Sequence, residues 1–195
     1  MGVSLAWVGI KSATAAAVQS KLGLAETGER GDYYDFPIAG LILPNDWYLL
    51  TAKRCDHPVR SDHVLSELSI GTTVVACSIE EHVMFVRASA WSNGREVWSM
   101  QHDGNDAAVM DLAVQGSPPE SFNALRERCV AQQAADGGKD NVDYVFEIPL
   151  ELAKSIVGFK HDEITSEIDS ESFWALRQGT TGLLTAARKP WWKIW

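Results

Sequence analysis

Short apolar runs separated by helical stretches fill the first eighty residues of the chain. Four of these runs have the length of buried strands: 3–10, 38–43, 47–52 and 72–79. One helix is expected to begin after Ser12 and to end at Gly23, and a second helix to begin at Ser61. The resulting order, β-α-β-β-α-β, is that of a ferredoxin-like or split βαβ unit.

The strongest local pattern is the dipeptide Asn93-Gly94 between two alternating runs, 82–91 and 95–102. Both residues of a type I′ turn need positive φ, which Asn and Gly tolerate, so a two-residue hairpin is predicted. The register that follows gives one large-residue face with these members: Phe85, Arg87, Ser89, Trp91, Glu96, Trp98, Met100 and His102. The other face carries small side chains and suits a close-packed helix.

The remainder of the chain predicts a meander with helices. The expected elements are a strand at 109–114, a helix opened by a capping box at 117–120, a strand at 142–148, a helix at 149–158, a loop at 160–172 and a short helix at 170–179. We therefore predict an α+β fold with a mainly antiparallel sheet and with helices packed on one side, in which the hairpin and meander follow a ferredoxin-like N-terminal half.

Composition fits one globular domain over residues 1–195. The chain is 46% apolar and 22% charged, and it is long enough to bury its own core. Its three cysteines, Cys55, Cys77 and Cys129, are odd in number and widely spaced, which argues against a disulfide framework and a structural zinc site. No cofactor or metal is expected. Lys11 interrupts the first apolar run too early for a signal peptide, so a cytoplasmic location is predicted.

Charge is unevenly distributed along the chain. The formal net charge is −9, and all acidic residues lie at or before Glu171. An acidic body repels phosphate backbones and attracts basic partners, so a protein partner with a basic surface is favoured over nucleic acid. No apolar stretch is long enough to cross a membrane.

A basic-aromatic tail, about 180–195, is expected to run extended after the domain and ends in the sequence RKPWWKIW. Its tryptophans, including Trp191 and Trp195, either pack on the domain itself or anchor a partner or a second copy of the chain. Self-association therefore remains open.

Catalytic motifs are missing from the sequence, but two polar clusters leave an enzyme possible. The segment Cys55–His63 places a thiol, histidines and acids within nine residues, and Glu80–His82 combines two acids with an imidazole. In the first segment, Cys55 beside a basic group such as His57 could act as a thiolate nucleophile, or the cluster could bind a metal. In the second, Glu80, Glu81 and His82 could act as a general base and its partner. Both also fit ordinary polar loops, and an enzyme of unrecognised type is the alternative hypothesis.

The favoured hypothesis is a non-enzymatic binding protein, most concretely an immunity-type inhibitor of a toxin that acts through an acidic, aromatic-containing surface. The residues expected to bind the partner are Trp91, Trp98, Arg87, Glu96, His102, Trp191 and Trp195. The competing interpretation is that the aromatic face of the hairpin belongs to the core.

Overall fold

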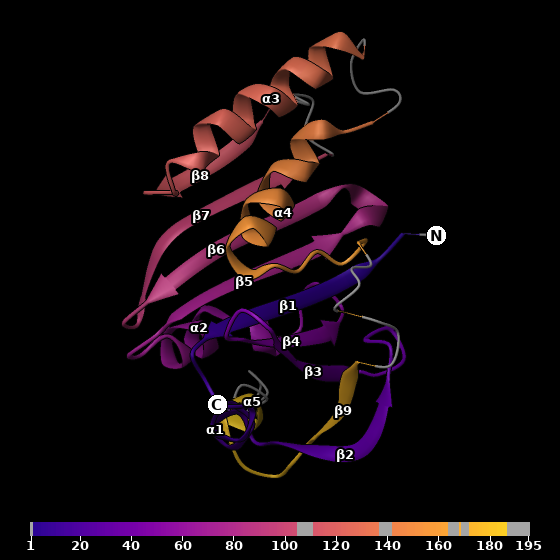
Figure 1. Cartoon of the computed structure of the whole chain (residues 1–195), viewed down its shortest axis with the longest axis vertical. Coiled ribbons are helices and arrows are strands. Elements are labelled where there is room, and N and C mark those ends of the chain that lie inside the picture. Colours follow the sequence, from indigo (N-terminus) through magenta and orange to yellow (C-terminus); the bar gives the residue numbers. More distant parts are fainter. Residues whose placement is uncertain (1, 105–110, 137–141, 164–167, 169–171, 187–195) are drawn as a thin grey trace, which may run out of the picture.

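The computed structural model describes residues 2–104, 111–136, 142–163, 168 and 172–186. Its elements are β1 (Ser4–Lys11), α1 (Ala15–Leu22), β2 (Leu24–Gly31), β3 (Ile38–Leu43), β4 (Trp47–Lys53), η1 (Pro58–Arg60), α2 (Asp62–Leu68), β5 (Thr73–Glu80), η2 (Glu81–Val83), β6 (Phe85–Ser92), β7 (Arg95–Asp103), β8 (Leu112–Gly116), α3 (Ser121–Ala135), α4 (Tyr144–Val157), β9 (Phe173–Gln178) and α5 (Leu183–Ala186). The strands form one antiparallel sheet in the order β2-β9-β3-β4-β1-β5-β6-β7-β8 (Figure 1). The predicted α+β class with a mainly antiparallel sheet is confirmed.

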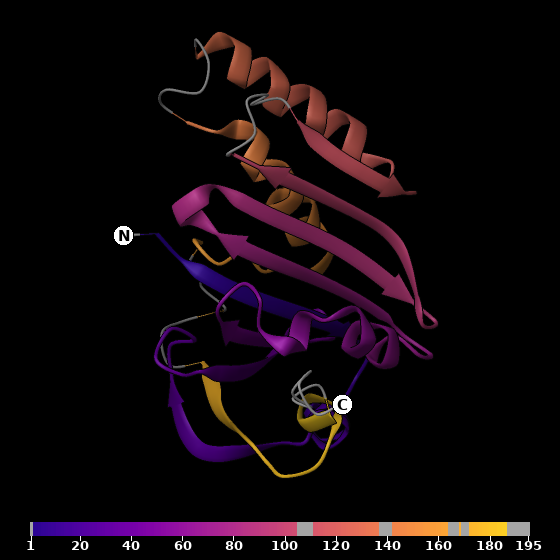
Figure 2. The same cartoon turned by 180° about the vertical axis from the view of Figure 1, so that it is seen from behind.

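Helices lie on both faces of this sheet, so the prediction that they pack on one side is wrong. Strand β1 explains why: Leu5 and Trp7 point into the core beneath α3 and α4, whereas Ala6 and Val8 point into the core beneath α1 and α2. A strand that is buried on both faces has a continuous apolar sequence rather than an alternating one, and the sequence of β1 is of this kind. Figure 2 shows η1 and α2 on the face opposite α4.

The N-terminal half contains one strand more than predicted. Strand β2 has a polar sequence with exposed side chains between its first and last residue, so no apolar alternation identifies it. It pairs with β9 at one edge of the sheet. Because β2 interrupts the predicted β-α-β-β-α-β order, the ferredoxin-like interpretation of this half is not confirmed.

The two-residue turn at Asn93-Gly94 is confirmed, but the predicted register of its hairpin is wrong. Both turn residues have positive φ, 49° and 80°. Trp91 then pairs with Glu96 and Ala90 with Trp98, so that a bulge shifts the register by one residue. Since a one-residue shift reverses the side to which each later side chain points, Trp91 and Trp98 lie on opposite faces of the sheet.

Two segments adopt a different element from the predicted one. Residues 142–148 belong largely to helix α4 rather than to a strand, because Asp143 accepts hydrogen bonds from the backbone N–H groups of Val145 (3.1 Å) and Phe146 (3.0 Å) and starts the helix. Residues 173–178 form strand β9 rather than a helix, inserted between β2 and β3. A short apolar run is compatible with either element until its neighbours are known.

The C-terminal segment is only partly described. Residues 183–186 form α5, whose Leu184 is buried in the core beside α1. The predicted extended tail, about 180–195, is described only up to residue 186, and α5 lies in that part; the remainder, with Trp191 and Trp195, lies outside the described residues. Of the helices in the described part of the chain, none has the length and apolarity needed to cross a bilayer.

Candidate functional site

A network of ion pairs gathers acidic side chains beside α4. The ammonium group of Lys160, which follows this helix, lies 2.8 Å from Glu147, 3.2 Å from Glu151 and 3.2 Å from Asp162. Glu163 is shared between Lys160 and Lys154. Burial alone would lower the pKa of Lys160, but the surrounding carboxylates, Glu147 first among them, raise it above its usual value. The lysine therefore stays charged and holds the acids together.

The network continues toward the loop after β2 and the end of β5. His161 Nε2 lies 3.0 Å from Glu81, and its Nδ1 lies 3.8 Å from Asp162. Tyr33 donates a hydrogen bond from its hydroxyl to the carbonyl oxygen of His161, and its ring contacts that of Tyr34 with centroids 4.1 Å apart. The loop that carries these tyrosines is thereby fixed against the segment that carries Lys160.

Together these segments form a surface that is rich in acids and includes an aromatic ring. We call it the acidic surface and define it by Asp32, Tyr34, Glu81, Glu147, Glu151, Asp162 and Glu163. Tyr34 is 40% exposed. Its partial burial raises its pKa, and the negative charges of Glu81, Asp32 and Asp162 raise it further. Six carboxylates against two lysines leave this surface strongly negative.

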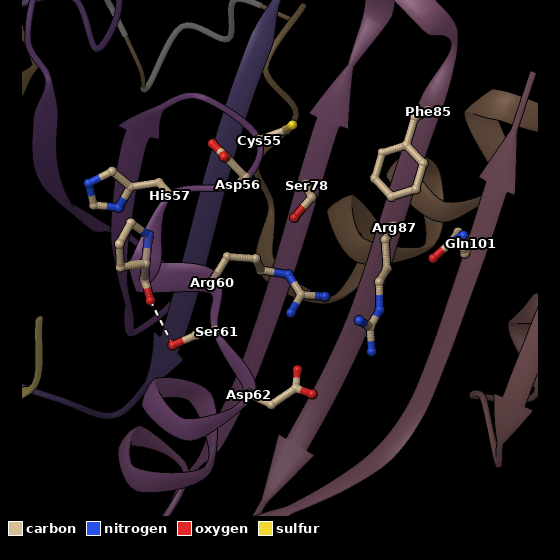
Figure 3. Close-up of a pocket in the computed structure, with 11 residues that line it drawn as sticks. Cys55, Asp56, His57, Arg60, Ser61, Asp62, Ser78, Phe85, Arg87 and Gln101 are labelled. Carbon is tan, nitrogen blue, oxygen red and sulfur yellow. Dashed lines mark hydrogen bonds between the residues drawn. The ribbon is translucent and has the colours of Figure 1, made fainter. Parts of the chain in front are cut away.

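The opposite face of the sheet carries a polar groove. Arg87 of β6 lies opposite Ser78 of β5 and Gln101 of β7, so the three side chains form a row across the sheet. The segment after β4 borders this row and completes a groove of 440 Å³ (Figure 3). We call it the polar groove, and its central residues are Cys55, Arg60, Ser78, Phe85, Arg87 and Gln101. Figure 2 shows no described helix over β6, β7 and β8 on this face.

Cys55 lines the groove, but its surroundings oppose a nucleophilic role. Its thiol lies 3.8 Å from a carboxylate oxygen of Glu80, and burial raises its pKa, with a further contribution from the charges of Glu80 and Asp56. A reactive thiolate needs the reverse, a lowered pKa beside a cation. His57, the expected base, uses Nδ1 to accept a hydrogen bond from the backbone N–H of Val59 at 3.2 Å.

The two segments proposed for an enzyme site are neighbours in space. Glu80 contacts Cys55 through one oxygen and His82 through the other, with 2.5 Å to Nδ1 of His82. The carboxylate therefore lies between the thiol and the imidazole, so that the imidazole does not contact the thiol directly. Within the described ranges, no three His, Cys, Asp or Glu side chains converge as metal ligands would.

The predicted partner-binding residues are separated by the fold. Arg87 and Glu96 reach the open face, where their side chains form an ion pair of 3.0 Å. Trp91, Trp98 and His102 are buried. Trp91 donates to Ser89 at 3.1 Å, and Trp98 belongs to the core beneath α3 and α4. Five of the predicted partner-binding residues lie in the described part of the chain, and among these only Arg87 and Glu96 are accessible to a partner.

The acidic surface was not located by the sequence. Its acids come from four segments, at 32, 81, 147–151 and 162–163, and only their overall excess is visible in the composition. The one local indication of this surface is the group of five acids between 160 and 172, which predicts a loop or a solvated edge.

Comparisons with protein-family models, with curated proteins and with solved structures find no match to this chain.

Proposed function

We propose that this chain is a non-enzymatic binding protein, most concretely an immunity-type inhibitor that neutralises a toxin with a basic surface. The observation that supports it best is the acidic surface around Tyr34. Charged surfaces of one sign increase the rate at which an oppositely charged protein associates, and they disfavour wrong partners. An exposed tyrosine at the centre of such a surface provides the aromatic contact that binding interfaces favour.

The way the acids are held is also suited to binding. Lys160 and His161 are buried beneath the surface and fix the carboxylates from below, while the acids themselves remain partly exposed, from 27% for Glu151 to 45% for Asp162. A surface that is already ordered loses less conformational entropy when a partner binds. The enzyme hypothesis has less support, because the thiol of Cys55 has a raised pKa and its acid neighbour separates it from His82.

The proposal is tested by expressing this chain together with the toxin candidate encoded beside its gene. We expect the chain to relieve growth arrest, and the double variant Asp162→Asn, Glu163→Gln to relieve it less. Four acids surround Lys160, and the variant changes two of them. Because the lysine keeps Glu147 and Glu151 as partners, the variant is expected to fold.

A matched control removes two exposed acids, with Glu127→Gln in α3 and Asp136→Asn directly after it. This control changes the net charge by the same amount as the Asp162→Asn, Glu163→Gln variant, but its two residues lie outside the acidic surface. Growth arrest that the chain does not relieve, or that the two double variants relieve equally well, would contradict the proposal. A gene neighbourhood without a toxin would contradict its immunity-type form.

A further inference from the structure

Arg60 is a buried cation that forms no ion pair with any residue the structure describes. The residue is only 6% exposed, and no carboxylate of the described residues lies within ion-pair distance of its guanidinium group. Its one hydrogen bond to a described residue runs from Nη2 to Ser89 Oγ at 3.0 Å, and its buried Nε has no acceptor there. A buried charge costs free energy unless it is paired, so this arrangement is unfavourable without a ligand.

A second guanidinium group lies beside this buried cation. Arg60 and Arg87 project toward the same part of the polar groove (Figure 3). Burial lowers the pKa of Arg60 to about 10, and the positive charge of Arg87 contributes in the same direction, while the charges of Asp62 and Glu96 act in the opposite direction without cancelling this effect. Arg87 is bound to Glu96 through Nη2 and is partly exposed, so it retains N–H groups that can reach a ligand.

We propose that the polar groove binds the oxyanion of a small organic anion, a carboxylate or a phosphate monoester, between Arg60 and Arg87. Guanidinium groups match the planar carboxylate and the phosphate by paired hydrogen bonds. The hydroxyl of Ser78 and the amide of Gln101 flank Arg87 on the neighbouring strands and complete a polar cradle.

The groove also indicates what the rest of the ligand is like. Phe85 lies two residues before Arg87 on the same face of β6 and lines the same groove, so it offers an apolar surface next to the cations. A volume of 440 Å³ falls within the range of small-molecule sites. Asp56 and Asp62 line the groove too, and their carboxylates disfavour a ligand that carries further negative charge beyond the group held by the arginines. This favours a ligand with one anionic end and an apolar body.

The test uses the full chain with two probes, sodium benzoate and inorganic phosphate, each compared with sodium chloride at the same ionic strength. We expect at least one probe to raise the melting temperature above the chloride control and to give a measurable Kd by calorimetry. Tighter binding of benzoate identifies the ligand as an apolar carboxylate, and tighter binding of phosphate identifies it as a phosphate monoester.

Variants decide whether the groove is the site. Arg60→Met should abolish binding, and Arg87→Gln should weaken it by about tenfold or more, as expected for losing a hydrogen bond to a charged group. Arg95→Gln, on the same hairpin but exposed and outside the groove, is the control and should bind like the original chain. If Arg60→Met does not fold, Arg87→Gln alone decides, because that side chain is partly exposed.

Two results would overturn the inference. One is that neither probe raises the melting temperature beyond chloride, and the other is that Arg87→Gln binds as tightly as the Arg95→Gln control. Neither result affects the proposed function, because the acidic surface lies beside α4 on the opposite face of the sheet and none of these variants changes it.

Discussion

At the scale of single residues, the pair His102–Asp143 joins the sheet to α4. His102 is completely buried, and its Nε2 lies 2.8 Å from Asp143 Oδ2, while its Nδ1 faces the carbonyl oxygen of Asp111 at 2.9 Å. Burial would lower the pKa of His102, but these two hydrogen bonds raise it above its usual value. Burial likewise opposes the ionised form of Asp143, but the hydrogen bonds with His102 and the backbone hold its pKa below the usual range.

These shifts predict how the stability of the fold depends on pH. A raised pKa for His102 means that its contribution is present below about pH 6.5 and is lost as pH rises through the folded pKa. A lowered pKa for Asp143 means that its contribution is present above about pH 4 and is lost as pH falls through the folded pKa. The pair therefore stabilises the protein most between these limits.

We expect the urea midpoint to fall when pH is raised from about 6 to about 8, and His102→Gln to remove most of that fall. The variant should also lose about 2 kcal/mol of stability at the lower pH, as expected for a buried hydrogen bond to a charged group. His63→Gln, at an exposed position of α2, is the control and should keep the pH dependence of the original chain. An unchanged pH dependence in His102→Gln would show that this pair is not its source.

At the scale of elements, the β6–β7 hairpin is held by its turn and by α2. The backbone N–H of Gly94 donates to Ser69 Oγ at 3.0 Å, and Ser66 donates its hydroxyl hydrogen to the Gly94 carbonyl at 2.9 Å. The N–H of Asn93 donates to the carbonyl oxygen of Ser69 at 2.8 Å. The turn that reverses the chain thus also fixes α2 against the end of the sheet.

Gly94→Ala should lower the free energy of unfolding by about 1–2 kcal/mol, the cost of placing a side chain in the left-handed region. The cost is conformational, because a Cβ at this position meets only Ser66, with Oγ at 3.5 Å and the carbonyl oxygen at 3.9 Å, which are ordinary contact distances. Urea unfolding measures it, with Arg95→Ala as the neighbouring control. Equal stability of the two variants would mean that the turn does not require glycine.

The elements that the sequence predicts well are those whose conformation is determined by residues close together in the sequence. The dipeptide Asn93-Gly94 specifies its turn without reference to the rest of the chain. Strands β2 and β9 could not be predicted in the same way, because Leu24 pairs with Gln178, more than 150 residues away. The bulge in β7 also has no local signature, and it turns Trp98 and His102 from the expected face to the other side of the sheet, where both are buried.

At the scale of the whole molecule, the sheet separates two surfaces of different chemistry. The acidic surface lies beside α4, and the polar groove with its two arginines lies on the other face. The sequence predicts the excess of acids and a basic partner, but not where the acids gather, because the surface forms only when four distant segments meet. The clusters at Cys55–His63 and Glu80–His82 were each identified from the sequence, whereas their contact through Glu80 was not.

The central claim is that the acidic surface attracts a basic protein, and the rate of association tests it most directly. The association rate constant of the chain with the proposed toxin partner should fall steeply as sodium chloride rises from about 0.05 M to about 0.5 M, because salt screens exposed charges. At low salt the Asp162→Asn, Glu163→Gln variant should associate more slowly and with a shallower salt dependence than the Glu127→Gln, Asp136→Asn control. Equal rates and equal salt dependence for the two variants would contradict the account.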